Sequence, residues 1–326
     1  MTEELISKYL KDFKKLNRGH TKGLGRAPHK PILLLSVLQL IESGAIRTNR
    51  IMISADLVLK FKTIWEQLVE TSHVPNFALP FFHLRSEPFW FLVPKPGKNL
   101  SITKSKSIKS FRSLKETFAY AELEKDLFLL LQNPLSHTVF EQFLLDNYFS
   151  NTKARYSKTA ISYQESLITN EILNEPSEIY QQQIKRLRET LKDDEFEEEV
   201  FVRGGLFKKN IPKIYDYTCC ISGLKIETNE NIQMVDACHI YPFSLSNDDT
   251  IPNGLALSPT MHRAFDRGLL TINANFVVRV SPSIEETDST FPLSQFEGKQ
   301  ILLPEKEKWH PSQASLSWHN KEVFLL

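Results

Sequence analysis

Three polar residues in the C-terminal third of the chain, His239, Asn253 and His262, have the types and spacing that chemistry would need. The run that ends near His239, residues 233–240, predicts a strand, and residues 241–254 are rich in Pro, Asn, Asp and Ser, which predicts a loop. Ser258 followed by proline predicts the start of a helix that carries His262. A strand, loop and helix in this order can bring the three side chains into one small site. A neutral imidazole in such a site can accept a proton from water.

The segment from about residue 217 to residue 272 resembles the HNH nuclease family, most clearly from Asn253 through His262 into the run FDRGLL. The resemblance implies a ββα core, a hairpin and a helix around one divalent metal ion. It also implies hydrolysis of phosphodiester bonds, which needs an activated water and a cation near the developing charge. It assigns three catalytic residues: His239 as general base, Asn253 as the amide that orients it through the loop, and His262 as a metal ligand.

The predicted metal site departs from the family at one position. Many members carry an Asp or His ligand directly before the base, where this chain has Cys238. Mg²⁺ prefers oxygen, so a thiolate would be a poor partner. Asp236 lies on the same strand face as Cys238, and Asp266 lies one helical turn after His262. We therefore expect Asp236, His262 and Asp266 to hold Mg²⁺ or Mn²⁺, and which carboxylate completes the site stays open. Because the three cysteines form no Cys-x-x-Cys pair, we expect no structural zinc.

Apolar spacing predicts a mainly helical N-terminal part. The expected helices cover residues 3–16, 32–41, 55–69, 114–131 and 139–148, and residues 90–93 are expected to form a strand. Together with the ββα-metal HNH domain that the resemblance implies, this predicts an α+β fold class, with a mainly helical N-terminal domain before the nuclease. We expect boundaries at 1–150 for the reading domain, 151–200 for a charged helical linker and 201–326 for the nuclease.

Two N-terminal segments resemble the sulfur-binding domain of restriction enzymes that attack phosphorothioate-modified DNA. They are residues 26–35, beginning Arg-Ala-Pro-His-Lys-Pro, and residues 79–85, Leu-Pro-Phe-Phe-His-Leu-Arg, followed by Phe89 and Trp90. An apolar cup strips water from a phosphate oxygen at a cost that sulfur, a weaker hydrogen-bond acceptor, largely avoids. The resemblance implies a cup of Leu79, Pro80 and His83, where Leu79 replaces a frequent tyrosine. It also implies phosphate contacts by Arg26, His29 and Lys30 and a base or phosphate contact by Arg85. The apolar residues of these segments could equally be plain core.

Composition limits the remaining possibilities. The 326 residues allow two domains, and the net charge of +1 leaves any DNA-binding charge local. Arg203, in the lead-in to the nuclease, could contact a phosphate or lie at the surface. No apolar run is long enough to span a bilayer and the N-terminus lacks a signal core, so we expect a cytoplasmic protein with no membrane contact. Cutting both strands needs two active sites, which favours a homodimer.

The sequence thus predicts a metal-dependent endonuclease of modification-dependent restriction that cuts phosphorothioate-modified double-stranded DNA. Two alternatives stay open. The N-terminal domain could read a methylated base or a plain sequence, since Phe82 and Trp90 could form an aromatic cage. The site could also be dead, leaving a DNA-binding protein, because Cys238 stands beside the base.

Overall fold

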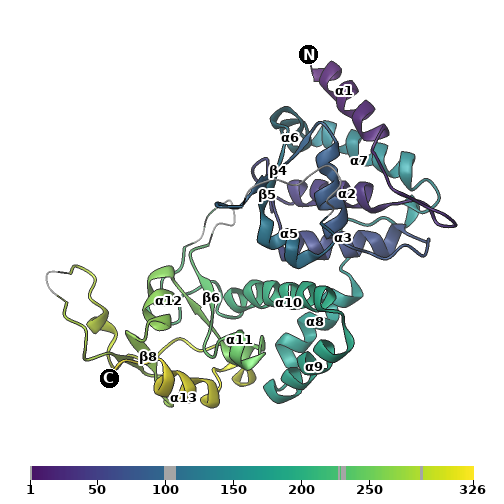
Figure 1. The fold of residues 1–326 in the computed structure, drawn as a ribbon. Coiled ribbons are helices and arrows are strands. Elements are labelled where there is room, and N and C mark those ends of the chain that lie inside the picture. The colour runs from purple at the N-terminus through teal and green to yellow at the C-terminus, as the bar shows by residue number, and fades with distance from the viewer. Residues whose placement is uncertain (1, 99–107, 227, 229–232, 287–288) are drawn as a thin grey trace. The chain divides into compact units, whose positions relative to one another are not determined.

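The computed structural model describes residues 2–98, 108–226, 228, 233–286 and 289–326 (Figure 1). The chain divides into two compact units, Met1–Glu165 with Lys192–Val202, and Ser166–Leu191 with Arg203–Leu326. Many helices and several small antiparallel sheets make it an α+β protein, as predicted. Helix α10 (Asp193–Ile214) contributes its first residues to one unit and the remainder to the other. The boundaries expected at residues 150 and 200 stay predictions.

A buried helix lies at the centre of the first unit. Helix α2 (His29–Glu42) is apolar almost all round, and its residues Lys30–Ile41 are buried, as expected for a helix inside a core. It packs against α3 (Ala55–Leu68), α4 (Ala78–His83), α6 (Lys125–Gln132) and α7 (Pro134–Tyr148). Helix α1 (Thr2–Lys14) covers α6 and α7. The predicted helices at 3–16, 32–41, 55–69 and 139–148 are confirmed.

A three-stranded antiparallel sheet completes the first unit, in the order β3 (Arg50–Met52), β5 (Phe118–Leu123), β4 (Trp90–Pro94). The single helix predicted over 114–131 is wrong: helix α5 (Phe111–Thr117) ends where β5 begins, and α6 follows it. The central strand hydrogen-bonds on both sides and buries Phe118, Ala121 and Leu123. These long-range contacts override the local helical spacing. A short hairpin, β1 (His20–Thr21) with β2 (Gly25–Arg26), stands before α2.

The second unit contains the predicted strand, loop and helix. Strand β6 (Asp236–His239) pairs antiparallel with β7 (Gly254–Leu257), and α12 (Pro259–Asp266) packs on both. The connecting loop holds a short helix, α11 (Phe243–Ser246), and a 3-10 turn, η3 (Ile251–Asn253). A second hairpin, β8 (Leu270–Ile272) with β9 (Val278–Val280), and α13 (Gln313–Glu322) follow. Helices α8 (Tyr163–Asn174) and α9 (Ser177–Thr190) bury Ile168, Ile172, Tyr180 and Ile184.

Two glycines allow close backbone approaches in this unit. A Cβ atom at Gly254 would lie 2.2 Å from the Ile211 side chain and 2.9 Å from the Phe207 ring, so a larger residue would force these α10 side chains to move away from β7. Gly268 ends α12 with φ +69°, and a Cβ there would lie 2.0 Å from the Val323 carbonyl oxygen. This position fits the predicted helix end.

Among the helices that the structure describes, none combines the length and the apolar character needed to cross a bilayer.

Candidate functional site

His239 lies at the end of β6, and two neighbours fix its ring. Its Nε2 atom lies 2.8 Å from the Oδ1 atom of Asp249, a carboxylate that is 1% exposed. The ring stacks on Phe207 of α10, with centroids 3.9 Å apart and an angle of 8° between the planes. Its other nitrogen, Nδ1, has no hydrogen-bond partner among the residues that the structure describes. The side chain is 21% exposed, so the ring is held but remains accessible to water.

Asn253 is fully buried and holds the loop between the two strands of the hairpin. Its side-chain oxygen accepts a hydrogen bond from the Tyr241 backbone N–H at 2.9 Å. Its amide nitrogen donates to the carbonyl oxygens of Tyr241 at 2.8 Å and Asp248 at 2.9 Å. The Asn253 amide therefore joins Tyr241, two residues after His239, to Asp248, the residue before Asp249. Since a buried amide must satisfy all of its polar atoms, the loop has little freedom to shift.

His262 lies on α12 with a carboxylate facing each ring nitrogen. Its Nδ1 atom lies 3.7 Å from Oδ2 of Asp236, on β6, and its Nε2 atom lies 3.4 Å from Oδ2 of Asp266, one helical turn later. Both carboxylate side chains are more than half exposed, at 56% and 58%. The three residues predicted to bind metal are thus close together at the surface. One strand, β6, supplies Asp236 at its start and His239 at its end.

Cys238 lies under this group. Its thiol contacts Oδ1 of Asp266 at 3.7 Å, and the Cys238, His262 and Asp266 ligand atoms all lie within 4.8 Å of one another. Burial, and next the negative charge of Asp266, raise the pKa of the Cys238 thiol well above its usual value. Cys238 therefore favours the protonated thiol, a poor metal ligand. Asp236 and Asp266, which face different nitrogens of the His262 ring, offer the oxygen atoms that a divalent cation such as Mg²⁺ prefers.

A second group that could bind a cation, Glu42, His137 and Glu141, lies in the first unit. The ammonium group of Lys158 lies between its two carboxylates, 2.8 Å from Glu42 and 2.9 Å from Glu141. Because a lysine already neutralises these carboxylates, the group has a structural explanation.

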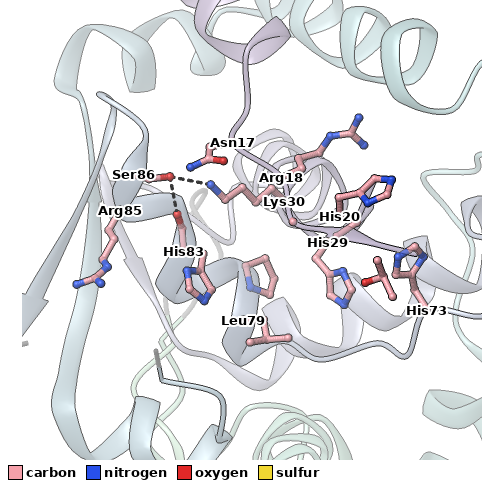
Figure 2. Close-up of a pocket in the computed structure, with 14 residues that line it drawn as sticks. Asn17, Arg18, His20, His29, Lys30, His73, Leu79, His83, Arg85 and Ser86 are labelled. Atoms are coloured by element: carbon pink, nitrogen blue, oxygen red, sulfur yellow. Dashed lines mark hydrogen bonds between the residues drawn. The ribbon is translucent and has the colours of Figure 1, made fainter. Parts of the chain in front are cut away.

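A pocket of about 860 Å³ opens in the first unit. Figure 2 shows Arg18, His20, His29 and His73 on one side, His83, Arg85 and Ser86 on the other, and Leu79 between them. The wall also includes Pro80, which is buried, and the pocket lining contains no acidic side chain among the residues that the structure describes. Of the residues that the sequence predicted for reading DNA, the pocket includes His29, Lys30, Leu79, Pro80, His83 and Arg85.

The cationic residues of the pocket differ in what they can reach. Lys30 is buried and paired with Glu87 at 2.5 Å, with a further bond to Ser86 at 2.9 Å, so its charge is already neutralised. The Arg85 guanidinium lies 4.1 Å from the centroid of the Phe82 ring, which it covers. Burial lowers the pKa of His29, whose Nε2 atom lies 3.0 Å from the Val74 carbonyl oxygen. Burial, with the charges of Lys30, Arg85 and Lys109, lowers the pKa of His83. Both histidines therefore favour the neutral form at neutral pH.

Two residues predicted to contact DNA lie elsewhere. Arg26 is exposed on β2, outside the pocket, where it lines a neighbouring depression together with Arg18. Arg203 is 4% exposed, and its guanidinium donates to Glu171 at 2.6 Å beside the Tyr180 ring. A buried, paired arginine cannot meet a phosphate at the surface, so we do not retain Arg203 as a DNA contact.

Sequence reasoning missed several residues around both places. Asp249 and Phe207 contact His239, and the loop residues Asn17, Arg18 and His20 line the pocket together with His73. The acidic pair at 248–249, inside the loop that follows His239, was the available signal for Asp249. Phe207 had no such signal, since it comes from a helix more than thirty positions earlier in the chain.

Comparisons with known proteins bear on the second unit. Residues 219–273 match the family model described as HNH endonuclease, which confirms the predicted HNH domain of a DNA-cleaving nuclease. HNH nucleases generally use a divalent metal ion, and the group around His262 supplies candidate ligands. No curated protein sequence matches the chain significantly.

Two solved structures are similar to parts of the chain. A modification-dependent TagI restriction endonuclease matches with 19% identity and a TM-score of 0.27 over 36% of this chain and 37% of its own. The type IV phosphorothioation-dependent restriction endonuclease ScoMcrA matches with 11% identity and a TM-score of 0.34, over 78% of this chain and 94% of its own. This chain thus spans little more than a third of the TagI chain. At these TM-scores neither similarity supports a conclusion about fold or substrate.

Proposed function

We propose that this chain, in which residues 219–273 form an HNH endonuclease domain, hydrolyses phosphodiester bonds in double-stranded DNA that carries phosphorothioate groups. The observation that carries the nuclease half is the arrangement around β6. A fixed imidazole stands at one end of this strand, and a carboxylate that faces the His262 ring stands at the other. This pairing of a base with a candidate cation site is what phosphodiester hydrolysis requires.

In this proposal His239 is the general base. Its free Nδ1 atom accepts a proton from the water whose oxygen attacks phosphorus, and one phosphorus–oxygen ester bond breaks. Asn253 acts indirectly, because its three hydrogen bonds hold the loop that follows the base. Asp236, His262 and Asp266 would hold a Mg²⁺ or Mn²⁺ ion, which supplies positive charge for the developing negative charge on the phosphate.

The pocket of the first unit is our candidate for the reading site. Leu79 and Pro80 give it an apolar wall, and Arg18 and Arg85 supply positive charge. A phosphate oxygen that meets an apolar wall loses water without replacement, while a sulfur atom loses much less. The cations would hold the neighbouring phosphates, a contact that is independent of base sequence. His29 and His83, mainly neutral here, would contact the backbone as hydrogen-bonding groups and not as charges.

We also propose that two copies act together. Each chain carries one HNH domain, and a double-strand cut needs one reaction on each strand. Analytical ultracentrifugation with and without modified duplex tests this: a monomer at all concentrations, bound and free, would contradict it.

The test of the proposed function is a cleavage assay on three matched plasmids: phosphorothioate-modified, methylated and plain. We expect Mn²⁺- or Mg²⁺-dependent cutting of the phosphorothioate plasmid, with no cutting in the presence of a chelator. Equal cutting of all three plasmids would contradict the sulfur preference, and preference for methylated DNA would favour a base-reading domain. The pocket, at about 860 Å³, is large enough that a base-reading domain has to be tested, so the assay needs the methylated plasmid.

The matched variant for this assay is His239→Ala. Removal of a general base lowers the rate by roughly 10²–10⁴-fold. We expect this variant to bind modified duplex as the wild type does, because His239 lies in the second unit and the pocket lies in the first. Cutting by His239→Ala at the wild-type rate would rule out His239 as the base.

A further inference from the structure

Asp249 is a buried carboxylate directed at the imidazole that the proposed chemistry uses. It is 1% exposed, and the His239 Nε2 atom lies 2.8 Å from its Oδ1 atom. Its second oxygen, Oδ2, accepts a hydrogen bond from the Tyr180 hydroxyl at 3.5 Å. A carboxylate offers only acceptor atoms, so both of its contacts here are with donors. The His239 proton must then lie on Nε2, which leaves the lone pair on Nδ1.

We propose that Asp249 is a positioning residue of the nuclease: it fixes the tautomer and orientation of His239 so that Nδ1 faces water as the acceptor. The proposal rests on the proposed function. It deepens that function by adding a residue outside the His239, Asn253 and His262 set. In the reaction, Nδ1 takes one proton from water, the hydroxide oxygen bonds to phosphorus, and the phosphorus–oxygen bond to the leaving ester oxygen breaks. The leaving oxygen takes a proton from solvent.

The loop that carries Asp249 is held on both sides. The Asp248 carboxylate accepts a hydrogen bond from the Thr250 backbone N–H at 2.9 Å, and its carbonyl oxygen accepts one from Asn253. Thr250 in turn contacts Ser177 of α9 through its hydroxyl at 3.0 Å. Asn253 therefore orients the base through this loop, because it holds the residue before Asp249. The hydrogen bonds of Asn253 hold the loop, and the loop in turn holds the Asp249 carboxylate against the His239 ring.

Two further buried residues are connected to Asp249, Tyr180 directly and Arg203 through Tyr180. Burial, followed by the negative charge of Asp249, raises the pKa of the Tyr180 hydroxyl, so the hydroxyl remains a donor. Arg203 lies beside the Tyr180 ring, 5.5 Å from its centroid, and pairs with Glu171. Arg203 is therefore a buried structural residue of the second unit, next to Tyr180. These contacts connect Arg203, Tyr180, Asp249 and His239 in that order, and His239 is the most exposed of the four.

The test combines a kinetic and a spectroscopic measurement on the full chain. The decisive variant is Asp249→Asn, which keeps the volume but can turn an amide donor toward Nε2 and drive the proton to Nδ1. The matched control is Asp248→Asn: the neighbouring carboxylate is also buried, at 3% exposed, but it bonds to the backbone of Thr250 and not to the ring. Circular dichroism first checks that both variants fold.

For the kinetics we use phosphorothioate plasmid with Mn²⁺. Loss of the carboxylate that selects a catalytic tautomer lowers kcat by up to about 10⁴-fold, so we expect a fall of roughly 10²–10⁴-fold for Asp249→Asn. KM should stay within about twofold, since no DNA contact is removed. Asp248→Asn should retain wild-type kcat within about threefold, because the Asn Oδ1 atom can still accept the Thr250 N–H bond that holds the loop.

For the spectroscopy we use two-bond ¹H–¹⁵N correlation spectra of histidine-labelled protein without metal. The His239→Gln spectrum identifies the His239 signals. We expect the proton on Nε2 in the wild type and in Asp248→Asn, and on Nδ1, wholly or in part, in Asp249→Asn. A wild-type ring protonated on Nδ1 would overturn the proposal even if no variant folds. So would Asp249→Asn with an Nε2 proton and normal kcat. If the wild type cuts no DNA, the proposed function fails, but the spectra still decide the role of Asp249.

Discussion

Cys238 is the residue at which this chain departs most from the pattern of the HNH nucleases that it resembles, because it stands directly before His239, the proposed base. The side chain is fully buried, and its thiol lies 3.7 Å from Asp266. The oxygen atoms around His262 belong instead to the exposed Asp236 and Asp266. Since Mg²⁺ selects oxygen over sulfur, the carboxylates are the better ligands and the thiol fills space beneath them.

This assignment predicts a clear difference between two variants. Cys238→Ala should retain Mg²⁺-dependent cutting within about threefold, because no ligand to a hard cation is removed. Asp266→Ala should reduce it by roughly 10²-fold or more, with partial recovery at high metal concentration. Titration of cutting against Mg²⁺ concentration measures both. A requirement for the Cys238 sulfur, seen as loss of Mg²⁺ cutting in Cys238→Ala, would contradict the assignment.

At the scale of elements, α13 is held to the second unit by a buried histidine. His319 is 2% exposed; its Nδ1 atom lies 2.8 Å from the Thr271 hydroxyl on β8 and its Nε2 atom 3.1 Å from the Phe265 carbonyl oxygen. The ring also stacks on Phe265 at 3.6 Å. Burial lowers the pKa of His319 from 6.5 to about 4, and the Phe265 carbonyl opposes this shift only in part.

The depressed pKa gives a stability prediction with a definite sign. The unfolded chain binds a proton below pH 6.5 and the folded chain only below about pH 4, so His319 stabilises the fold fully above 6.5. Its contribution falls by about 1.4 kcal/mol for each pH unit below 6.5. Urea unfolding of wild type and His319→Gln, from about pH 7.5 to about pH 5, should show the stability gap narrowing as the pH falls. A constant gap would contradict the prediction.

The elements also show what the sequence could and could not predict. The HNH strand, loop and helix were predictable, because their signals are local: Asn253, the Ser258–Pro259 start and Gly268 lie within sixteen residues. Strand β5 was not, because its apolar spacing fits a helix, and only pairing with β3 and β4 makes it a strand. Asp249 and Phe207 escaped for a similar reason. Their role is defined by a contact with His239 that no local pattern encodes.

At the scale of the whole molecule, the proposed reading site and the proposed cutting site belong to different units. The pocket is lined by residues of the first unit, and the groups around His239 and His262 belong to the second. Variants in one unit should therefore alter selectivity, and variants in the other should alter the chemical step. If the two sites act independently, a double variant at Leu79 and His239 should show the sum of the free-energy effects that the two single variants have on binding and on rate.

The apolar wall of the pocket gives the sharpest test of the reading half. Leu79→Asn puts a hydrogen-bonding amide where a phosphate oxygen would otherwise lose water, so the penalty against unmodified DNA falls by about 1–2 kcal/mol. We expect the preference for phosphorothioate over plain duplex to fall roughly tenfold in a competition binding assay. Leu129→Asn is the matched control, since Leu129 is an exposed leucine of the same unit, outside the pocket lining. If both variants keep the wild-type preference, sulfur is read elsewhere, and if both lose it, the loss is not specific to the pocket.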